Sequence, residues 1–232
     1  MTATIPFPFT RLDAAGLNRQ HLFDLAELPT GVRATLGDTC GFSQLLLVGH
    51  GGCQLWACMQ AGGIKGDDPI DHYTCQTLAR WFAQELPGHT YRILYPGDAP
   101  IGLQALGELA GWHHPTPFRV GIDQEWGTWF AYRAAVLCTT PFSSFLRIDR
   151  GSPCANCAER PCIAACPPQA LAGGAFDLNA CFEWRMQPDS SCANTCLARL
   201  ACPVGPQHRY DESQICHSYG RSLNLLRQYL RP

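Results

Sequence analysis

Eight of the fourteen cysteines of this chain fall between Cys154 and Cys202, and this concentration of thiols constrains the fold more than any other feature. Residues 151–206 otherwise consist of proline, small residues and short polar stretches, with few large aliphatic side chains. Such a segment buries too little apolar surface to offset the entropy lost on ordering it. Its thiols must therefore form disulfides, bind metal or take part in catalysis. The spacing of the cysteines helps to distinguish these three roles.

The eight thiols form two sets, each of which ends in Cys-Pro. The first set reads C-x2-C-x4-C-x3-C-P, and the second reads C-x10-C-x3-C-x5-C-P. Bacterial two-cluster ferredoxins use a similar run, in which the fourth cysteine ligates the other cluster. The same crossing predicts two [4Fe–4S] clusters, one ligated by Cys154, Cys157, Cys162 and Cys202, the other by Cys166, Cys181, Cys192 and Cys196. Structural zinc, which usually takes paired ligands, and disulfides, which persist in oxidising compartments, are the alternatives.

Composition limits the partners and the compartment. The net charge is −2, Lys65 is the single lysine and there is no basic run, which predicts no nucleic-acid partner and no anionic membrane surface. No apolar stretch is long enough to cross a bilayer, and the start lacks the regions of a signal peptide. We therefore expect a cytoplasmic protein with reduced thiols. Six further cysteines are scattered along the chain, and most of them are expected to be small buried side chains: Cys40, Cys53, Cys58, Cys75, Cys138 and Cys216.

Hydrophobic periodicity predicts an α+β scaffold in residues 1–150. Asp68-Pro69 favours the start of a helix that continues to Leu86, and a further helix is expected between Pro100 and Gly111. The stretch "QLLLVGHGG" predicts a buried strand that enters a glycine-rich turn, where a planar cofactor is the alternative reason for the glycines. "TYRILYP" predicts a short strand, and residues 128–138, apolar on both faces, predict a central strand.

The C-terminal segment, residues 207–232, predicts a helix that packs back on the scaffold. It begins in a manner similar to a capping box at Asp211 and Gln214. One apolar stripe follows: Ile215, Tyr219, Leu223, Leu226 and Leu230. Residues 151–206 therefore read as an insert near the end of the scaffold.

Segments of this sequence resemble two protein families. "CANCAERPCIAACP", "FDLNACF" and "CANTCLARLACP" are similar to the cluster domain of epoxyqueuosine reductases, which depend on cobalamin and iron–sulfur clusters. "DPIDHYTCQTLARWFAQELP", "GIDQEWGTWFAYRAAVL" and "RYDESQICHSYG" resemble CblC-type cobalamin-processing proteins, over roughly residues 65–140 and 207–220. The resemblance implies a nitroreductase-like scaffold that binds a corrinoid and carries an inserted two-cluster ferredoxin-like module.

Arg133, in the middle of "WFAYRAAV", is the most informative scaffold residue. A buried guanidinium needs an anion, either a bound ligand or an internal carboxylate. The resemblance places Arg133 on the ligand side of a corrinoid pocket, as a catalytic residue, where the clusters replace glutathione as the electron source. Trp129 and Tyr132 are candidates to stack on the macrocycle, with packing in the core as the alternative.

The histidines of this region depart from the family pattern. CblC-type proteins carry a histidine where this sequence has Glu108, although His113 and His114 follow closely. These two are the remaining candidates for the corrinoid pocket, and their position before Pro115 favours a solvent-facing loop. Base-off binding without a protein ligand to cobalt is consistent with this departure.

The function that these features favour is an iron–sulfur oxidoreductase that binds a corrinoid and reduces or removes its upper axial ligand. A redox donor such as a ferredoxin or flavodoxin is the expected partner. The alternatives are an epoxyqueuosine-reductase-like enzyme that reduces an organic substrate, a ferredoxin-type electron carrier, and a corrinoid chaperone without chemistry.

Overall fold

The computed structural model describes residues 6–229, which divide into two compact units. The first unit ends at His113 and resumes for Phe130–Asp149, whereas the second contains His114–Trp129 and the chain from Arg150 onward. This division differs from the expected boundaries in two places. Residues 114–129 and the C-terminal helix both belong to the unit that carries the eight clustered cysteines. Leu230, expected in the stripe of that helix, lies outside the described residues.

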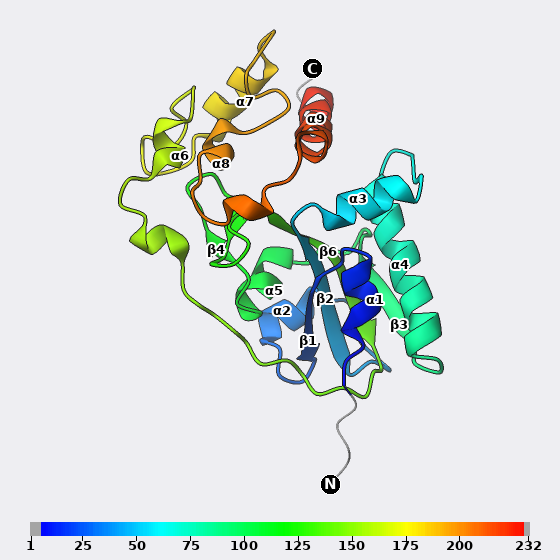
Figure 1. Cartoon of the computed structure of the whole chain (residues 1–232). Coiled ribbons are helices and arrows are strands. Elements are labelled where there is room, and N and C mark those ends of the chain that lie inside the picture. Colours follow the sequence, from blue (N-terminus) through cyan, green and yellow to red (C-terminus); the bar gives the residue numbers. More distant parts are fainter. Residues whose placement is uncertain (1–5, 230–232) are drawn as a thin grey trace. The chain divides into compact units, whose positions relative to one another are not determined.

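The first unit contains a four-stranded antiparallel sheet (Figure 1). In spatial order its strands are β1 (Arg19–Asp24), β2 (Gln44–Gly51), β6 (Phe130–Cys138) and β3 (Tyr91–Tyr95). The two inner strands are β2 and β6, and β2 is buried along its whole length. The prediction of a central strand near residues 128–138 is therefore confirmed.

Helices cover both faces of this sheet, which explains why its inner strands are continuously apolar. Alternate residues of β2 point to opposite faces: Leu46 and Val48 join one core, and Leu45 and Leu47 join the other. The first core includes side chains of α1 (Phe9–Ala14), α3 (Gln54–Ala61) and α4 (Pro69–Glu85). The second includes side chains of α2 (Thr30–Ala34) and α5 (Leu103–Leu109). The expected helices at 69–86 and after Pro100 are thus present.

The second unit consists of short elements joined by long loops. They are β4 (His114–Pro115), β5 (Gly121–Ile122), η1 (Pro153–Asn156), α6 (Pro161–Ala164), α7 (Leu178–Met186), α8 (Leu197–Leu200), η2 (Pro206–His208) and α9 (Glu212–Tyr229). As the sequence predicts, Asp211 caps α9, because its Oδ1 accepts the Gln214 amide at 2.7 Å. The stripe of α9 packs inside this unit, where Ile215 joins Trp129 and Tyr210.

A close approach of two backbones binds residues 114–129 into the second unit. Gly127 has φ +59°, and a Cβ built on it would lie 2.0 Å from the carbonyl oxygen of Val204. Only glycine allows this contact without displacing the chain. Thr128, next to it, is completely buried and accepts hydrogen bonds from Arg199. These non-local contacts explain why the segment does not belong to the scaffold.

Two further expectations concern membranes and the scattered cysteines. Within residues 6–229, none of the helices has the length and apolar character that crossing a membrane requires. The expectation that most of the six scattered cysteines are buried is wrong, because only Cys138 is buried. Cys40 and Cys216 are exposed, and the other three are half-buried.

Candidate metal centres and candidate cofactor site

Four cysteines from distant parts of the second unit line one cavity of about 230 Å³. They are Cys154 from η1, Cys157 just after it, Cys162 from α6 and Cys202 just after α8. Pro161 opens α6, and Arg160 before it has φ +42°, so the chain turns sharply between Cys157 and Cys162. Cys202 is separated from the others by forty residues, yet it faces the same cavity.

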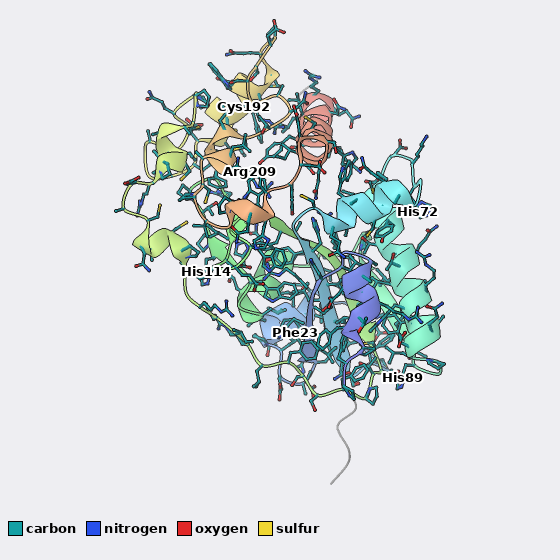
Figure 2. All side chains as sticks on the ribbon, in the orientation of Figure 1. Phe23, His72, His89, His114, Cys192 and Arg209 are labelled. Atoms are coloured by element: carbon teal, nitrogen blue, oxygen red, sulfur yellow. The ribbon has the colours of Figure 1, made fainter. Side chains whose placement is uncertain are left out.

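The other four cysteines line a second cavity of about 180 Å³. Cys166 follows α6, Cys181 lies on α7, Cys192 lies in the loop after it (labelled in Figure 2), and Cys196 directly precedes α8. Cys166 thus faces a different cavity from its neighbours in the C-x2-C-x4-C-x3-C-P motif. Each cavity is thus lined by the four cysteines that the sequence analysis assigns to one cluster.

All eight thiols are free of disulfide bonds. Burial raises the pKa of Cys181 to about 11, and the neighbouring thiol of Cys196 adds to this. Burial also raises the pKa of the thiols of Cys154, Cys162 and Cys202. Redox-catalytic cysteines have lowered pKa values. Across residues 6–229, no three cysteine, histidine or carboxylate side chains converge as the ligands of a single metal ion.

Apolar side chains and two buried polar atoms complete the second cavity. Its walls include Leu171, Phe176 and Phe182, and Phe118 lines both cavities. The Trp184 Nε1 and Thr195 Oγ1 atoms are buried here without a hydrogen-bond partner among the described residues. Both groups are donors, and buried donors without partners are rare in folded proteins. An acceptor such as a sulfur atom inside the cavity would satisfy them.

In the first unit, Arg133 lies at a β-bulge. The register of β2 against β6 shifts between Val48 and Gly49, so that Arg133 has no direct partner on β2. Bulges redirect side chains and occur often beside functional sites. The Arg133 Nε donates to His50 Nδ1 at 2.9 Å, and His50 is completely buried. Arg133 itself is half-buried, so the expected fully buried guanidinium is in fact accessible on one side.

Asp71 and Tyr95 accompany Arg133. Burial raises the pKa of the Asp71 carboxyl, and the positive charge of Arg133 opposes this. Burial also raises the pKa of Tyr95, to which the charge of Asp71 contributes. Asp71 lies in the first turn of α4, where a carboxylate normally only favours helix formation. The sequence therefore gave no separate signal for the group of Arg133, His50, Asp71 and Tyr95.

Tyr132 and His113 form a second group in this unit. The Tyr132 hydroxyl and His113 Nδ1 are 3.1 Å apart, and His113 is only 7% exposed, so the expected solvent-facing position of His113 is wrong. The ring of Trp112 lies nearly parallel to that of Tyr132, at 6.5 Å. The Tyr132 hydroxyl is also packed over Gly107 of α5, where a built Cβ would lie 1.8 Å from it.

Trp129 and His114 belong to the second unit, whereas Arg133 belongs to the first. Trp129 is completely buried and packs against Tyr210 and Arg199. His114 is half-buried in β4, which pairs with β5, and is therefore not in an open loop. Glu108, at the position of the family's histidine, is exposed on α5. The glycines of "GHGG" are explained by the strand itself, because a Cβ on Gly49 would lie 2.9 Å from the Ala131 carbonyl oxygen.

Comparison with known proteins finds similarity in structure only. No family model and no curated protein sequence matches the chain. Epoxyqueuosine reductase from Bacillus subtilis aligns with a TM-score of 0.52 and 11% identity, over 88% of this chain and 66% of that one. An epoxyqueuosine reductase in complex with a modified tRNA-Tyr stem loop gives 0.53 and 11%, over 89% and 66%. The B12-trafficking protein CblC of C. elegans gives 0.46 and 14%, over 92% and 90%.

These alignments place the chain in a known fold. At such identities the similarity to epoxyqueuosine reductases shows a shared fold, as the sequence resemblance predicts, and the chain spans 66% of the length of those enzymes. CblC is also among the structures that it resembles.

Proposed function

We propose that the second unit binds two [4Fe–4S] clusters and that the protein is an oxidoreductase which delivers their electrons to a bound corrinoid. The observation that carries this proposal is the division of eight cysteines into two sets of four, each around its own cavity. The division follows the ligand crossing of two-cluster ferredoxins and not the order of the cysteines along the chain.

The residues at each cavity fit such a group. Cubane clusters are held by four cysteine thiolates, and each cavity presents four. A water molecule takes about 30 Å³ of liquid volume, so cavities of about 230 and 180 Å³ have room for several heavy atoms. The two buried donors at the second cavity, Trp184 and Thr195, are of the kind that hydrogen-bond to cluster sulfur atoms. The clusters, when bound, supply one-electron transfer.

The chain's own residues set the conditions for this chemistry. Proline side chains and Phe118 line the first cavity, and aliphatic and aromatic side chains line the second, so much of the surface around the sulfur atoms is apolar. Phe118 lies at the wall of both cavities, and its ring separates them by apolar material rather than by solvent. The raised thiol pKa values mean that metal binding must displace protons from these cysteines.

The corrinoid part of the proposal is supported by the resemblance of the sequence to CblC-type proteins and by the shared fold with epoxyqueuosine reductases. A corrinoid bound here would supply a cobalt ion that accepts electrons. Arg133, which His50 holds in place, would attract a departing anion such as cyanide through its guanidinium. Tyr132 and His113 form a fixed polar pair on the same unit.

An epoxyqueuosine-reductase-like reduction of an organic substrate is the second candidate. Two observations favour it: the fold is shared with those enzymes, and the carboxyl group of Asp71 interacts electrostatically with Arg133. The lack of any basic run argues against tRNA as that substrate.

Anaerobic purification followed by iron, sulfide and corrinoid analysis tests the proposal. We expect about eight iron atoms per chain, as two cubane clusters require, and a change in the visible spectrum of hydroxocobalamin on binding. Dithionite-reduced protein should then accelerate reduction of the bound corrinoid. If the corrin spectrum does not change, the protein does not bind the corrinoid and a ferredoxin-type electron carrier is the remaining function. If the corrinoid binds but its reduction is not accelerated, the remaining function is that of a corrinoid chaperone. Absence of iron and sulfide would overturn the cluster proposal itself.

A further inference from the structure

Two arginines of the second unit are buried without a carboxylate partner. Arg199 is 8% exposed. Its guanidinium donates to the hydroxyl and the carbonyl oxygen of Thr128. It also lies over the rings of Trp129, at 4.4 Å, and Tyr210, at 5.0 Å. All of these partners are neutral, so the positive charge of Arg199 is not balanced by any described side chain.

Arg185 on α7 is in a similar position. It is 7% exposed and donates to the carbonyl oxygens of Cys192, Ala193 and Tyr219 and to the hydroxyl of Ser222. A buried guanidinium surrounded by neutral acceptors retains a large desolvation cost unless an anion lies nearby. Both arginines therefore point to negative charge close to them, and Arg185 itself lines the second cavity.

The two arginines differ in which thiols they reach. Arg185 lines the second cavity itself and donates to the carbonyl oxygen of Cys192, one of the four cysteines of that cavity. Arg199 lies on α8, the single helical turn that Cys196 precedes and Cys202 follows. These two cysteines face different cavities, so the turn that carries Arg199 connects a cysteine of one cavity to a cysteine of the other. Tyr219 adds a link, because its hydroxyl contacts both Arg199 and Cys196.

We propose that Arg199 is the shared countercharge of both clusters and raises both of their reduction potentials, whereas Arg185 acts on the second cluster alone. This inference rests on the clusters of the proposed function. Each one-electron reduction adds a negative charge to a cluster, and a fixed positive charge in a dry environment stabilises the reduced form. A single residue of α8 would thereby raise the reduction potentials of both clusters together.

Redox titration of the reconstituted holoprotein, followed by electron paramagnetic resonance, tests this. In Arg199→Met we expect the reduction equilibrium of each cluster to become about tenfold less favourable, which is a shift of about −59 mV for one electron. Arg185→Met should shift only the cluster of the second cavity. Arg227→Met, which removes an exposed charge from α9, should leave both potentials unchanged because solvent screens it.

Arg199→Lys separates charge from structure. It keeps the positive charge and loses the fork that binds Thr128, so both potentials should stay near those of the unaltered protein. If Arg199→Met fails to assemble clusters, Arg199→Gln, which removes the charge but keeps a polar donor toward Thr128, is titrated in its place and should shift both potentials in the same direction. Potentials in Arg199→Met that do not move, or of which only one moves, would overturn the shared role, as would an equal shift in Arg199→Lys. If the unaltered protein binds no iron, the proposed function fails and this inference fails with it, whereas unmoved potentials in an iron-loaded variant refute the inference alone.

Discussion

The crossed arrangement of the cysteines can be tested with double substitutions. Single substitutions cannot test it, because the arrangement concerns which pairs of cysteines share a cavity. Cys154 and Cys202 lie forty-eight positions apart and line the same cavity. Cys154 and Cys166 belong to the same short motif and line different cavities. Removing two ligands from one cavity leaves the four thiols of the other intact, whereas removing one ligand from each cavity damages both sites.

The expected iron contents follow from this count. With four iron atoms per cubane cluster, the unaltered chain should hold about eight iron atoms. Cys154→Ala with Cys202→Ala should hold about four, the same as either substitution alone. Cys154→Ala with Cys166→Ala should hold close to none. Alanine is used because, unlike serine, it offers no oxygen ligand in place of the thiol.

The assay is iron and acid-labile sulfide per chain after anaerobic reconstitution, with the resonance spectrum of the reduced protein as a second readout. Cys216→Ala is the matched control, since it removes an exposed cysteine of α9 and should retain about eight iron atoms. If each cluster were instead bound by four cysteines that are consecutive in the sequence, the expected iron contents of the two double variants would be exchanged. That result, with iron retained in Cys154→Ala/Cys166→Ala and lost in Cys154→Ala/Cys202→Ala, would refute the reasoning.

Three further predictions concern the first unit. Burial lowers the pKa of His21 to about 4, below its ordinary 6.5. The unfolded state therefore binds more protons in this range, and the unfolding free energy should fall by about 2 kcal/mol from pH 7 to pH 5 through this residue alone. His21→Phe keeps an aromatic ring beside Phe23. Its unfolding free energy, measured by urea unfolding at pH 7 and pH 5, should lack this pH-dependent decrease. Arg133→Gln should raise the pKa of Asp71, because the opposing charge is lost; carboxyl NMR, assigned with Asp71→Asn, would show an unchanged titration if the two groups do not interact. Gly107→Ala places a Cβ 1.8 Å from the Tyr132 hydroxyl and should cost about 1–3 kcal/mol of stability. Gly102→Ala, whose nearest neighbour is 3.6 Å away, should cost little, and equal losses would contradict the packing argument.

The parts of the fold that the sequence predicts well are those set by local chemistry. The α4 helix follows from Pro69 and an apolar stripe, and β2 follows from an unbroken aliphatic run that both faces of the sheet bury. The grouping of the cysteines was also predictable, because ligation to a common group constrains residues far apart in the chain. By contrast, β1 was not predicted, since its sequence "RQHLFD" mixes polar and apolar residues without a clear period.

The parts that escaped prediction depend on non-local packing. His50 reaches Arg133 only through the register shift between β2 and β6, which no sequence period reveals. Asp71 has the signature of an ordinary helix start. Residues 114–129 join the second unit because Gly127 meets the backbone at Val204, a contact between residues seventy-seven positions apart. A glycine in a loop has many explanations, so this one required the structure.

The two buried arginines of the second unit could not be distinguished from exposed arginines by sequence alone. Arg185 and Arg199 resemble the other arginines of a cysteine-rich, polar segment, in which exposed cations are normal. The structure buries both and surrounds them with carbonyl oxygens, hydroxyls and aromatic rings. The second unit has few large aliphatic side chains to offset that cost, and burial raises the pKa of several of its thiols, among them Cys181 and Cys202. Anionic clusters in the two cavities would resolve both difficulties together, by replacing thiol protons with iron and by supplying the charge that the arginines lack. The folding of this unit and the loading of its clusters are therefore expected to be one coupled process.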